Sequence, residues 1–288
     1  MPGMPIAPQL SFSAVCGVDF SGARLAGRTT WVARLAPSAG EGPPFTLTML
    51  RPLEKLCRTA ERGPALAHLV GMVATSEGCL WGLGFPFGFP LEVAGPWDEQ
   101  LALAGGWGDD AYGLGLELVR RTELLCGRKH LRRLTDLEHR APHDPYHYRV
   151  IYQTFFGLRD VLGPLMRTPG TAVLPFRYPC LPAARRVVVE TCPATTLDRL
   201  GLPRRNYKRP QGKALTPKEK RTRRKILRGL RAHVAFSGHR RGVMAKDPGG
   251  DALDAVLAAL GAAVAFAGAD HAAIAEHPRY RLEGRHFA

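Results

Sequence analysis

The stretch Ala14-Val15-Cys16-Gly17-Val18-Asp19-Phe20-Ser21-Gly22-Ala23 predicts the first strand of a sheet and the turn that leaves it. Its valines suit a buried strand, and Gly22 permits a sharp reversal directly afterwards. Asp19 then stands at the carboxyl end of the strand, which is the edge where open α/β sheets bind ligands. An Asp at such a position also caps turns through its side chain, so this segment alone leaves a structural role open.

The composition indicates a globular and strongly basic chain. Its 288 residues are enough for one large domain or two small ones, and a hydrophobic fraction of 45% is ordinary for a packed core. The net charge of +15 favours a polyanionic partner, with nucleic acid ahead of an anionic membrane. We find no apolar run of membrane-spanning length and no signal-peptide order, so we expect a cytoplasmic protein without a membrane partner. Six scattered cysteines without a CxxC pair predict reduced, buried thiols.

Periodicity places further elements around the first strand. Two stretches rich in β-branched and aromatic residues follow it across Gly/Pro turns, which predicts an antiparallel meander of three strands. An amphipathic helix, a buried strand stopped by prolines, a helical insertion on one side of the sheet and a second acid-tipped strand come next. The expected ranges are strands at 29–35 and 45–50, a helix at 61–75, a strand at 79–86, the insertion at about 96–180 and a strand at 186–190.

A basic segment at residues 204–241 carries almost the whole net charge. It holds fifteen Lys and Arg against one acid, Glu219. Thr216, Pro217 and Glu219 form a capping-box pattern that predicts a helix running to about Arg231. The segment has few aromatics, so it suits phosphate contact better than base stacking, although a solvated helix face is the plain alternative. The expected nucleic-acid contacts are Arg204, Arg205, Lys208, Arg209, Lys213, Lys220, Arg224 and Arg228.

Four acids have positions that a compact α/β fold can bring together. Asp19 and Glu190 end strands. Asp251 and Asp254 begin a buried helix that we expect to run to about Ala267. These two acids are spaced i and i+3, so they lie on one face of the helix. Clustered carboxylates repel one another unless a hard divalent cation such as Mg²⁺ or Mn²⁺ binds them. Such ions stabilise the attacking and leaving oxygens in phosphodiester cleavage. The pattern therefore indicates a metal site for nucleic-acid hydrolysis.

Each acid also has a simpler explanation. Asp251 and Asp254 fit a helix N-cap and a third-position acid. Glu190 could pair with one of the many arginines. Buried strand acids are uncommon without a partner, however, so the set is less easily dismissed than any one member.

Four short motifs, in their order, resemble a known family. They are Gly17-Val18-Asp19-Phe20-Ser21-Gly22-Ala23, Phe85-Pro86-Phe87-Gly88-Phe89-Pro90, Val189-Glu190-Thr191-Cys192-Pro193 and Asp251-Ala252-Leu253-Asp254-Ala255. The chain is similar, from about residue 14 to 267, to the domain-of-unknown-function 429 family, whose members are regarded as predicted nucleases with an RNase H-like fold. The resemblance implies an α/β fold with a mixed five-stranded sheet flanked by helices. It also implies that Asp19, Glu190, Asp251 and Asp254 are the metal-site acids.

One position departs from the family. Its pattern places an Asp before the proline of the fourth strand, and here Gly84 stands there. In RNase H-like enzymes the fourth strand lies beside the first, so the missing acid would be a bridging ligand. Three outcomes stay open: Glu190 substitutes for it, the site holds one metal, or the activity is lost.

Weaker signals complete the sequence. His143 and His147 are four residues apart, but the prolines around them argue against the helix that would make them metal ligands. The Gly17–Ala23 turn lacks the Gly-Lys-Ser/Thr of a phosphate-binding P-loop. Ser21 and Arg149 are possible cleft residues.

We therefore expect a flexible lead-in at 1–12, a single RNase H-like domain at 13–270 with an insertion after the fourth strand and a basic helical segment before the last helix, and a polar tail at 271–288. The expected function is a Mg²⁺- or Mn²⁺-dependent nuclease. A non-catalytic nucleic-acid-binding protein and a nucleotide-dependent phosphotransferase of the same fold are the alternatives. The sequence leaves open the choice between DNA and RNA and the oligomeric state.

Overall fold

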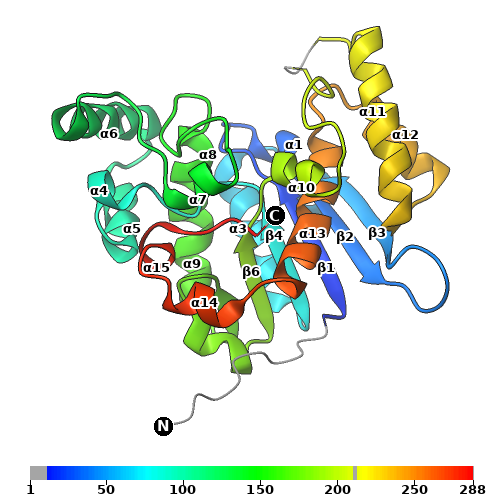
Figure 1. The fold of residues 1–288 in the computed structure, drawn as a ribbon, viewed down its shortest axis with the longest axis horizontal. Helices are drawn as coiled ribbons and strands as arrows, with labels where there is room; N and C mark the ends of the chain where they lie inside the picture. The colour runs from blue at the N-terminus through cyan, green and yellow to red at the C-terminus, as the bar shows by residue number, and fades with distance from the viewer. Residues whose placement is uncertain (1–11, 210–212, 288) are drawn as a thin grey trace.

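A computed structural model describes residues 12–209 and 213–287 of the chain. One mixed sheet of seven strands, with helices on both faces, forms its centre (Figure 1). The strands lie in the order β5-β6-β4-β1-β2-β3-β7. Their bounds are β1 (Ala14–Asp19), β2 (Trp31–Pro37), β3 (Phe45–Pro52), β4 (Cys79–Leu83), β5 (Thr171–Val173), β6 (Arg186–Glu190) and β7 (Val234–Ala235).

The first three strands form the expected antiparallel meander. β1 pairs with β2 and β2 pairs with β3, both antiparallel. β4 lies parallel to β1 on its other side, and β6 lies parallel to β4. The carboxyl ends of β1, β4 and β6 therefore share one edge of the sheet, where parallel strands commonly present ligand-binding residues.

Helices and short helical turns cover the sheet and fill the insertion. The α-helices are α1 (Ala26–Thr29), α2 (Glu54–Cys57), α3 (Arg62–Thr75), α4 (Leu91–Ala94), α5 (Trp97–Gly106), α6 (Ala111–Cys126), α7 (Leu134–Glu138), α8 (Ile151–Phe156), α9 (Gly163–Met166), α10 (Pro193–Arg199), α11 (Pro217–Gly229), α12 (Gly238–Lys246), α13 (Asp251–Ala267), α14 (His271–Glu276) and α15 (Tyr280–Glu283). The π-helical turn η1 (Gly157–Leu162) and the 3₁₀ turns η2 (Tyr178–Ala183) and η3 (Leu230–Ala232) join them.

The apolar helix α13 packs directly on the sheet, in front of it in the view of Figure 1. Two strand glycines allow the close approach. A Cβ atom at Gly17 of β1 would lie 2.2 Å from the Ala255 carbonyl oxygen, and one at Gly82 of β4 would lie 2.6 Å from the Ala258 oxygen. Helix backbone therefore rests against strand backbone, which brings the start of α13 to the end of β1. The opposite face is covered by α3, α8 and η1.

The sheet has two strands more than the five we expected, so that part of the expectation is wrong. β5 extends the sheet beyond β6, and β7 extends it beyond β3. The added strands have three and two residues. Segments so short carry no readable alternation, and neighbouring chain rather than local sequence decides their pairing.

The basic segment contains the predicted helix and more. α11 begins with the predicted capping box: the Glu219 amide donates to the Thr216 hydroxyl at 3.3 Å, and the Thr216 amide donates to the Glu219 carboxylate at 2.7 Å. η3 and β7 follow within the same segment, and a second helix, α12, begins in it and ends beyond it at Lys246. α11 and α12 stand beyond the β3 side of the sheet, at the upper right of Figure 1.

Residues 271–287 are integrated into the fold rather than forming a polar tail. They contain α14 and α15, and Phe287 is fully buried, with its amide donating to the Glu190 carbonyl at 2.7 Å. The expected lead-in at 1–12 lies, except for Phe12, outside the described residues.

The six cysteines are free thiols, as expected, but only Cys16 and Cys79 are buried. Across residues 12–209 and 213–287, each helix taken singly falls short of the length and hydropathy that a membrane crossing requires.

Candidate active site at the end of the first strand

Asp19 ends β1 and faces α13. Side chains two residues apart on a strand share a face, and Gly17 lies against α13, so Asp19 points to the same side. Its residue is only partly buried, because it stands at the open edge of the sheet. The strand thus presents this carboxyl group to the first turn of α13.

The first turn of α13 supplies the second carboxylate. Asp254 is 1% exposed and accepts hydrogen bonds from the Tyr207 hydroxyl at 2.8 Å and from Lys208 Nζ at 2.6 Å. The helix cap is provided elsewhere, because the Asp247 carboxylate accepts from the Ala252 amide at 3.0 Å. Gly250 is the N-cap residue of α13, so Asp251 does not have the N-cap role that the simpler explanation assigned to it.

The charges at this site are unevenly balanced. Burial of Asp19, followed by the nearby carboxylate of Asp254, raises the pKa of Asp19 well above its usual range, with further contributions from Asp251 and Asp247. Lys208 opposes this shift. Burial alone would lower the pKa of Lys208, but the carboxylates of Asp254 and Asp19 outweigh it and hold the pKa well above its usual value.

Arg223 adds a second positive charge without binding a carboxylate at this site. Its guanidinium is 1% exposed and donates to backbone carbonyls, including those of Tyr207 and Met244. Burial is the main cause that lowers the pKa of Arg223. The carboxylates of Asp254, Asp251 and Asp247 therefore gather around that of Asp19. A group of carboxylate oxygens of this kind fits a hard divalent cation such as Mg²⁺ or Mn²⁺.

Gly84 lies beside this group, where the resemblance places an acid. A Cβ atom at Gly84 would lie 3.7 Å from the Asp19 Cα and 2.9 Å from the Val18 carbonyl oxygen. The position therefore borders Asp19 but carries no side chain that could bind a metal ion.

We name the group Asp19, Asp247, Asp251, Asp254, Tyr207 and Lys208 the α13 acidic site.

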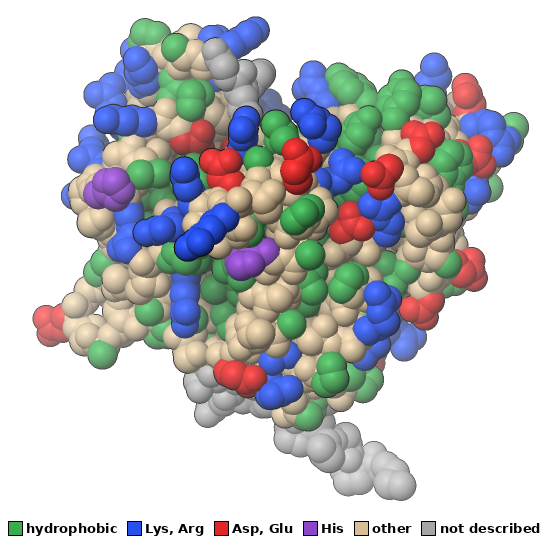
Figure 2. Space-filling view, turned by 180° about the vertical axis from the view of Figure 1, so that it is seen from behind, with side chains coloured by type: hydrophobic (Ala, Val, Ile, Leu, Met, Phe, Trp, Pro, Cys, Tyr) green, Lys and Arg blue, Asp and Glu red, His purple; other side chains and the backbone are tan. Residues whose placement is uncertain are grey.

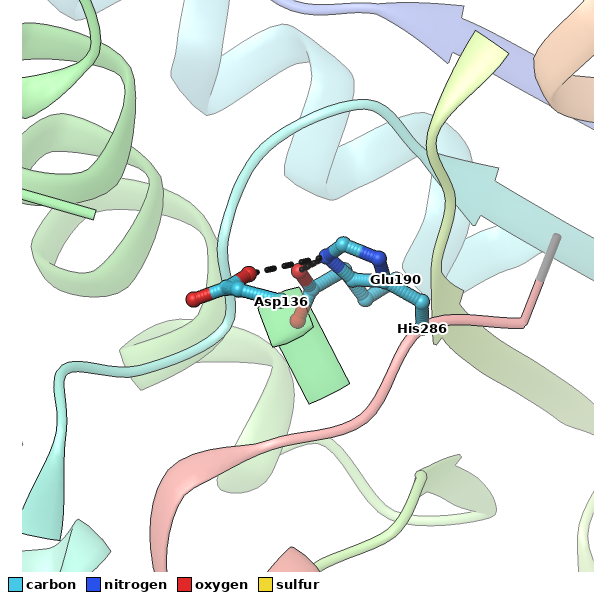
Figure 3. Close-up of side chains that lie close together, drawn as sticks. All are labelled: Asp136, Glu190 and His286. Atoms are coloured by element: carbon cyan, nitrogen blue, oxygen red, sulfur yellow. Dashed lines mark ion pairs between the residues drawn. The ribbon is translucent and has the colours of Figure 1, made fainter. Parts of the chain in front are cut away.

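Glu190 belongs to a different cluster, so its expected role at the same metal site is wrong. It is 1% exposed and lies with Asp136 and His286, as Figure 3 shows. Arg133 Nη2 approaches Glu190 Oε1 to 2.6 Å, and His286 Nε2 approaches the same oxygen to 2.7 Å. The Phe87 amide donates to the other oxygen at 2.9 Å. We call Arg133, Asp136, Glu190 and His286 the buried clamp.

The buried clamp balances its own charges. Burial would raise the pKa of Glu190, but Arg133 and His286 outweigh it and hold the pKa at about 2. Burial would lower the pKa of His286, but Glu190 and Asp136 raise it to about 10. Two carboxylates therefore face two cations.

The ligand atoms of Asp136, Glu190 and His286 lie within 4.8 Å of one another, close enough to hold a metal ion. The guanidinium of Arg133, however, also donates to Asp136, at 2.8 Å. A cation there would have to displace a buried arginine, so the arrangement suits an ion-pair clamp better.

The expected nucleic-acid contacts fall into two groups. Arg204, Lys208 and Arg209 pair with the acids Asp198, Asp254 and Glu219, respectively. The other five lie exposed on α11 and the loop before it: Arg205, Lys213, Lys220, Arg224 and Arg228. Figure 2 shows Lys and Arg side chains gathered at its upper left, where α11 and α12 lie when the molecule is seen from behind.

The possible cleft residues lie outside the α13 acidic site. Ser21 follows Asp19 and its side chain accepts from the Ala23 amide at 3.3 Å, which is a turn contact. Arg149 is exposed and donates from Nε to the Tyr148 hydroxyl at 3.0 Å.

The comparison with protein families matches one part of the chain. The model described as "Protein of unknown function (DUF429)" covers residues 166–279. Over this segment the chain is similar to the DUF429 family. No curated protein and no solved structure matches the chain.

The DUF429 segment contains the α13 half of the acidic site and one acid of the buried clamp. Lys208, Asp251 and Asp254 lie within it, whereas Asp19 comes from the first strand. Sequence reasoning missed Asp247 and Tyr207 at the acidic site. Asp247 could have been suspected from its place before Pro-Gly-Gly, since Asp is frequent in such turns.

Proposed function

We propose that the chain is a divalent-metal-dependent nuclease that hydrolyses phosphodiester bonds at the α13 acidic site. The observation that carries the proposal is the crowding of Asp19 with Asp254 and two further carboxylates, which raises the pKa of Asp19 well above its usual range. Carboxylates held this way, at the carboxyl edge of a sheet, are typical of sites that bind Mg²⁺ or Mn²⁺. A net charge of +15 supports a polyanionic substrate, nucleic acid, for such a site.

The arrangement of the central strands supports an RNase H-like fold for this proposal. β3, β2 and β1 form the antiparallel meander, the next strand along the chain lies parallel beside β1, and β6 follows it. The proposed fold therefore has β5 and β7 as additions at the two edges.

Each residue of the site has a proposed task. Asp19, Asp251 and Asp254 would hold the cation, which supplies Lewis-acid stabilisation of the phosphoryl oxygens and a nucleophilic water. The half-exposed side chain of Lys208 would donate from Nζ to a phosphate oxygen. The exposed cations of α11 would bind the backbone phosphates of the same strand.

A second candidate is a nucleic-acid-binding protein with a site that no longer cleaves. Two observations favour it. Gly84 offers no carboxylate beside Asp19, and the ammonium group of Lys208 already neutralises Asp254 at 2.6 Å. In this case Lys208 takes the place of the metal ion.

Titration of Mn²⁺ by calorimetry, followed by incubation with labelled DNA and RNA, tests the two candidates. We expect the wild type to bind Mn²⁺ and to cleave, and D254N to do neither. Asp98→Asn is the matched control, since Asp98 is an exposed acid on α5. Lys208→Gln should raise the affinity for Mn²⁺ by about tenfold, or ~1.4 kcal/mol, by removing the competing charge.

Failure of wild type and K208Q alike to bind Mn²⁺, with nucleic-acid binding retained, would overturn the nuclease proposal in favour of the second candidate. Cleavage that survives in D254N would also overturn it, because the activity would then arise elsewhere.

A further inference from the structure

A row of aromatic rings lies in the loop between α7 and α8. The rings of His143 and His147 stack with centroids 4.1 Å apart at an interplanar angle of 22°. His147 in turn lies 4.5 Å from Tyr148 at 33°, and 5.4 Å from His130. Because stacked rings direct their nitrogen lone pairs sideways, this row presents π faces rather than converging metal ligands.

The row borders a pocket of about 230 Å³ against α6. Tyr112 and Tyr148 line it and are 50% and 60% exposed, which is unusual for large aromatic side chains. Tyr146 also lines it, but this ring is buried and its hydroxyl accepts from the Leu131 amide at 2.6 Å. The pocket thus has a fixed inner aromatic residue and two aromatic residues open to solvent.

The charges around the row favour a polyanion. The exposed residues Arg128, Lys129 and Arg132 flank His130, and Arg149 lies over the Tyr148 ring with its Cζ 5.5 Å from the centroid. The acid in the loop, Asp144, is 3% exposed and is held by His130 Nδ1 at 2.8 Å. Exposed aromatic faces interleaved with arginine and lysine are the features that bind single-stranded nucleic acid by base stacking.

The row is attached to the turn that leaves β1. Gln153 Nε2, at the start of α8, donates to the Phe20 carbonyl at 2.9 Å. A Cβ atom at Gly22 would lie 2.0 Å from the Tyr152 carbonyl oxygen. The start of α8 therefore rests against the residues that directly follow Asp19, and the loop with the rings ends at this contact.

We propose that the ring row His143, His147 and Tyr148, with the pocket between Tyr112 and Tyr148, binds unpaired bases of single-stranded nucleic acid. The inference takes its ligand class, nucleic acid, from the proposed function. It narrows that class to single strands, because stacking on the rings needs bases that are not paired. Bases of a duplex are already stacked on one another and cannot enter the pocket.

Fluorescence anisotropy in EDTA tests this inference without any cleavage. The probes are a labelled thymidine 20-mer and a labelled 20-base-pair duplex. We expect Tyr112→Ala/Tyr148→Ala to weaken binding of the single strand by about 10- to 100-fold, as the loss of one stacked base does, and to leave duplex binding unchanged. Tyr148→Trp should keep the affinity, since an aromatic face remains.

Tyr152→Ala is the matched control, because Tyr152 is 44% exposed on α8 but does not line the pocket. Equal loss for single strand and duplex, or no loss in the double variant, overturns the inference; the second result would fit a protein partner for the pocket instead. Because EDTA removes the metal, this assay measures binding alone. Intact single-strand selectivity in EDTA, together with absent cleavage in the Mn²⁺ incubation, would defeat the nuclease proposal alone.

Discussion

Asp19 and Glu190 lie on opposite faces of the sheet, although each ends a parallel strand at the same edge. Val18 is in register with Leu83 of β4, and Leu83 is in register with Glu190. Residues in register share a face, and the next residue along a strand points to the other. Glu190 therefore points with Val18 toward the insertion, while Asp19 points toward α13. The two carboxylates cannot bind one cation, so Glu190 does not compensate for Gly84.

Glu190→Gln should lower the free energy of unfolding by about 3–5 kcal/mol, because it removes one charge of a buried ion-pair group and leaves Arg133 under-neutralised. Mn²⁺ affinity at the α13 acidic site should stay unchanged. Urea denaturation and calorimetry on the folded variant check the two statements. Loss of Mn²⁺ binding by a folded E190Q would show that the clamp is the metal site.

The buried clamp should make stability depend on pH in two directions. The pKa of Glu190 is lowered from 4.5 to about 2. Its contribution to folding stability is therefore complete above pH 4.5 and is lost as the pH falls toward 2. The pKa of His286 is raised from 6.5 to about 10. Its contribution to folding stability is therefore complete below pH 6.5 and is lost as the pH rises toward 10. Stability from the clamp is therefore maximal between these windows.

Urea denaturation at pH 5.5 and pH 9.5 measures the alkaline side. The wild type should lose stability between the two values, while His286→Gln should be less stable at pH 5.5 and change less between them. If the wild type and H286Q lose equal stability between pH 5.5 and pH 9.5, groups other than His286 cause the loss.

Asp19→Asn should stabilise the metal-free protein at pH 7. The raised pKa of Asp19 means that its ionisation above pH 3.8 favours the unfolded chain, so stability falls as pH rises through the range up to the folded pKa. Asn removes this loss, and we expect a gain of about 1–3 kcal/mol by calorimetric unfolding in EDTA. Added Mn²⁺ should raise the midpoint of wild type but not of D19N. A variant less stable than wild type in EDTA would contradict the unfavourable burial of Asp19.

Gly17→Ala should disrupt the α13 acidic site from a distance. The new methyl group would meet helix backbone at 2.2 Å and force α13 away from β1, at a cost of about 1–3 kcal/mol or more. We expect weaker Mn²⁺ binding together with a lower unfolding midpoint. Gly63→Ala is the control, since a Cβ at Gly63 in α3 meets no atom within 4 Å and should leave both quantities unchanged or slightly improved. Normal Mn²⁺ affinity in folded G17A would show that the α13 acidic site does not depend on the close packing of α13 on β1.

Elements with strong local signals could be predicted from the sequence. The three-stranded meander follows from β-branched runs between Gly/Pro turns, and α11 follows from its capping box. α13 follows from an apolar run behind two acids. The pairing of Asp19 with the start of α13 was within reach because a strand end and a helix start are both defined by such local signals.

Register and long-range ion pairs could not be predicted in the same way. The face to which Glu190 points depends on how β6 aligns with β4, and no residue of β6 itself encodes that alignment. Arg133 and His286 look like ordinary surface residues in a basic chain until the fold buries them beside Glu190. Lys208 was expected to contact phosphate, and only the fold shows that it contacts Asp254.

The α13 acidic site joins a residue from the first strand to residues from the last long helix, and this has a consequence during synthesis. Asp19 leaves the ribosome early, but Lys208 and Asp254 leave it only after most of the chain has been translated. A nascent chain therefore displays Asp19 without its partners. If the site cleaves nucleic acid, the growing polypeptide is harmless to its own messenger until α13 has been made and docks on β1.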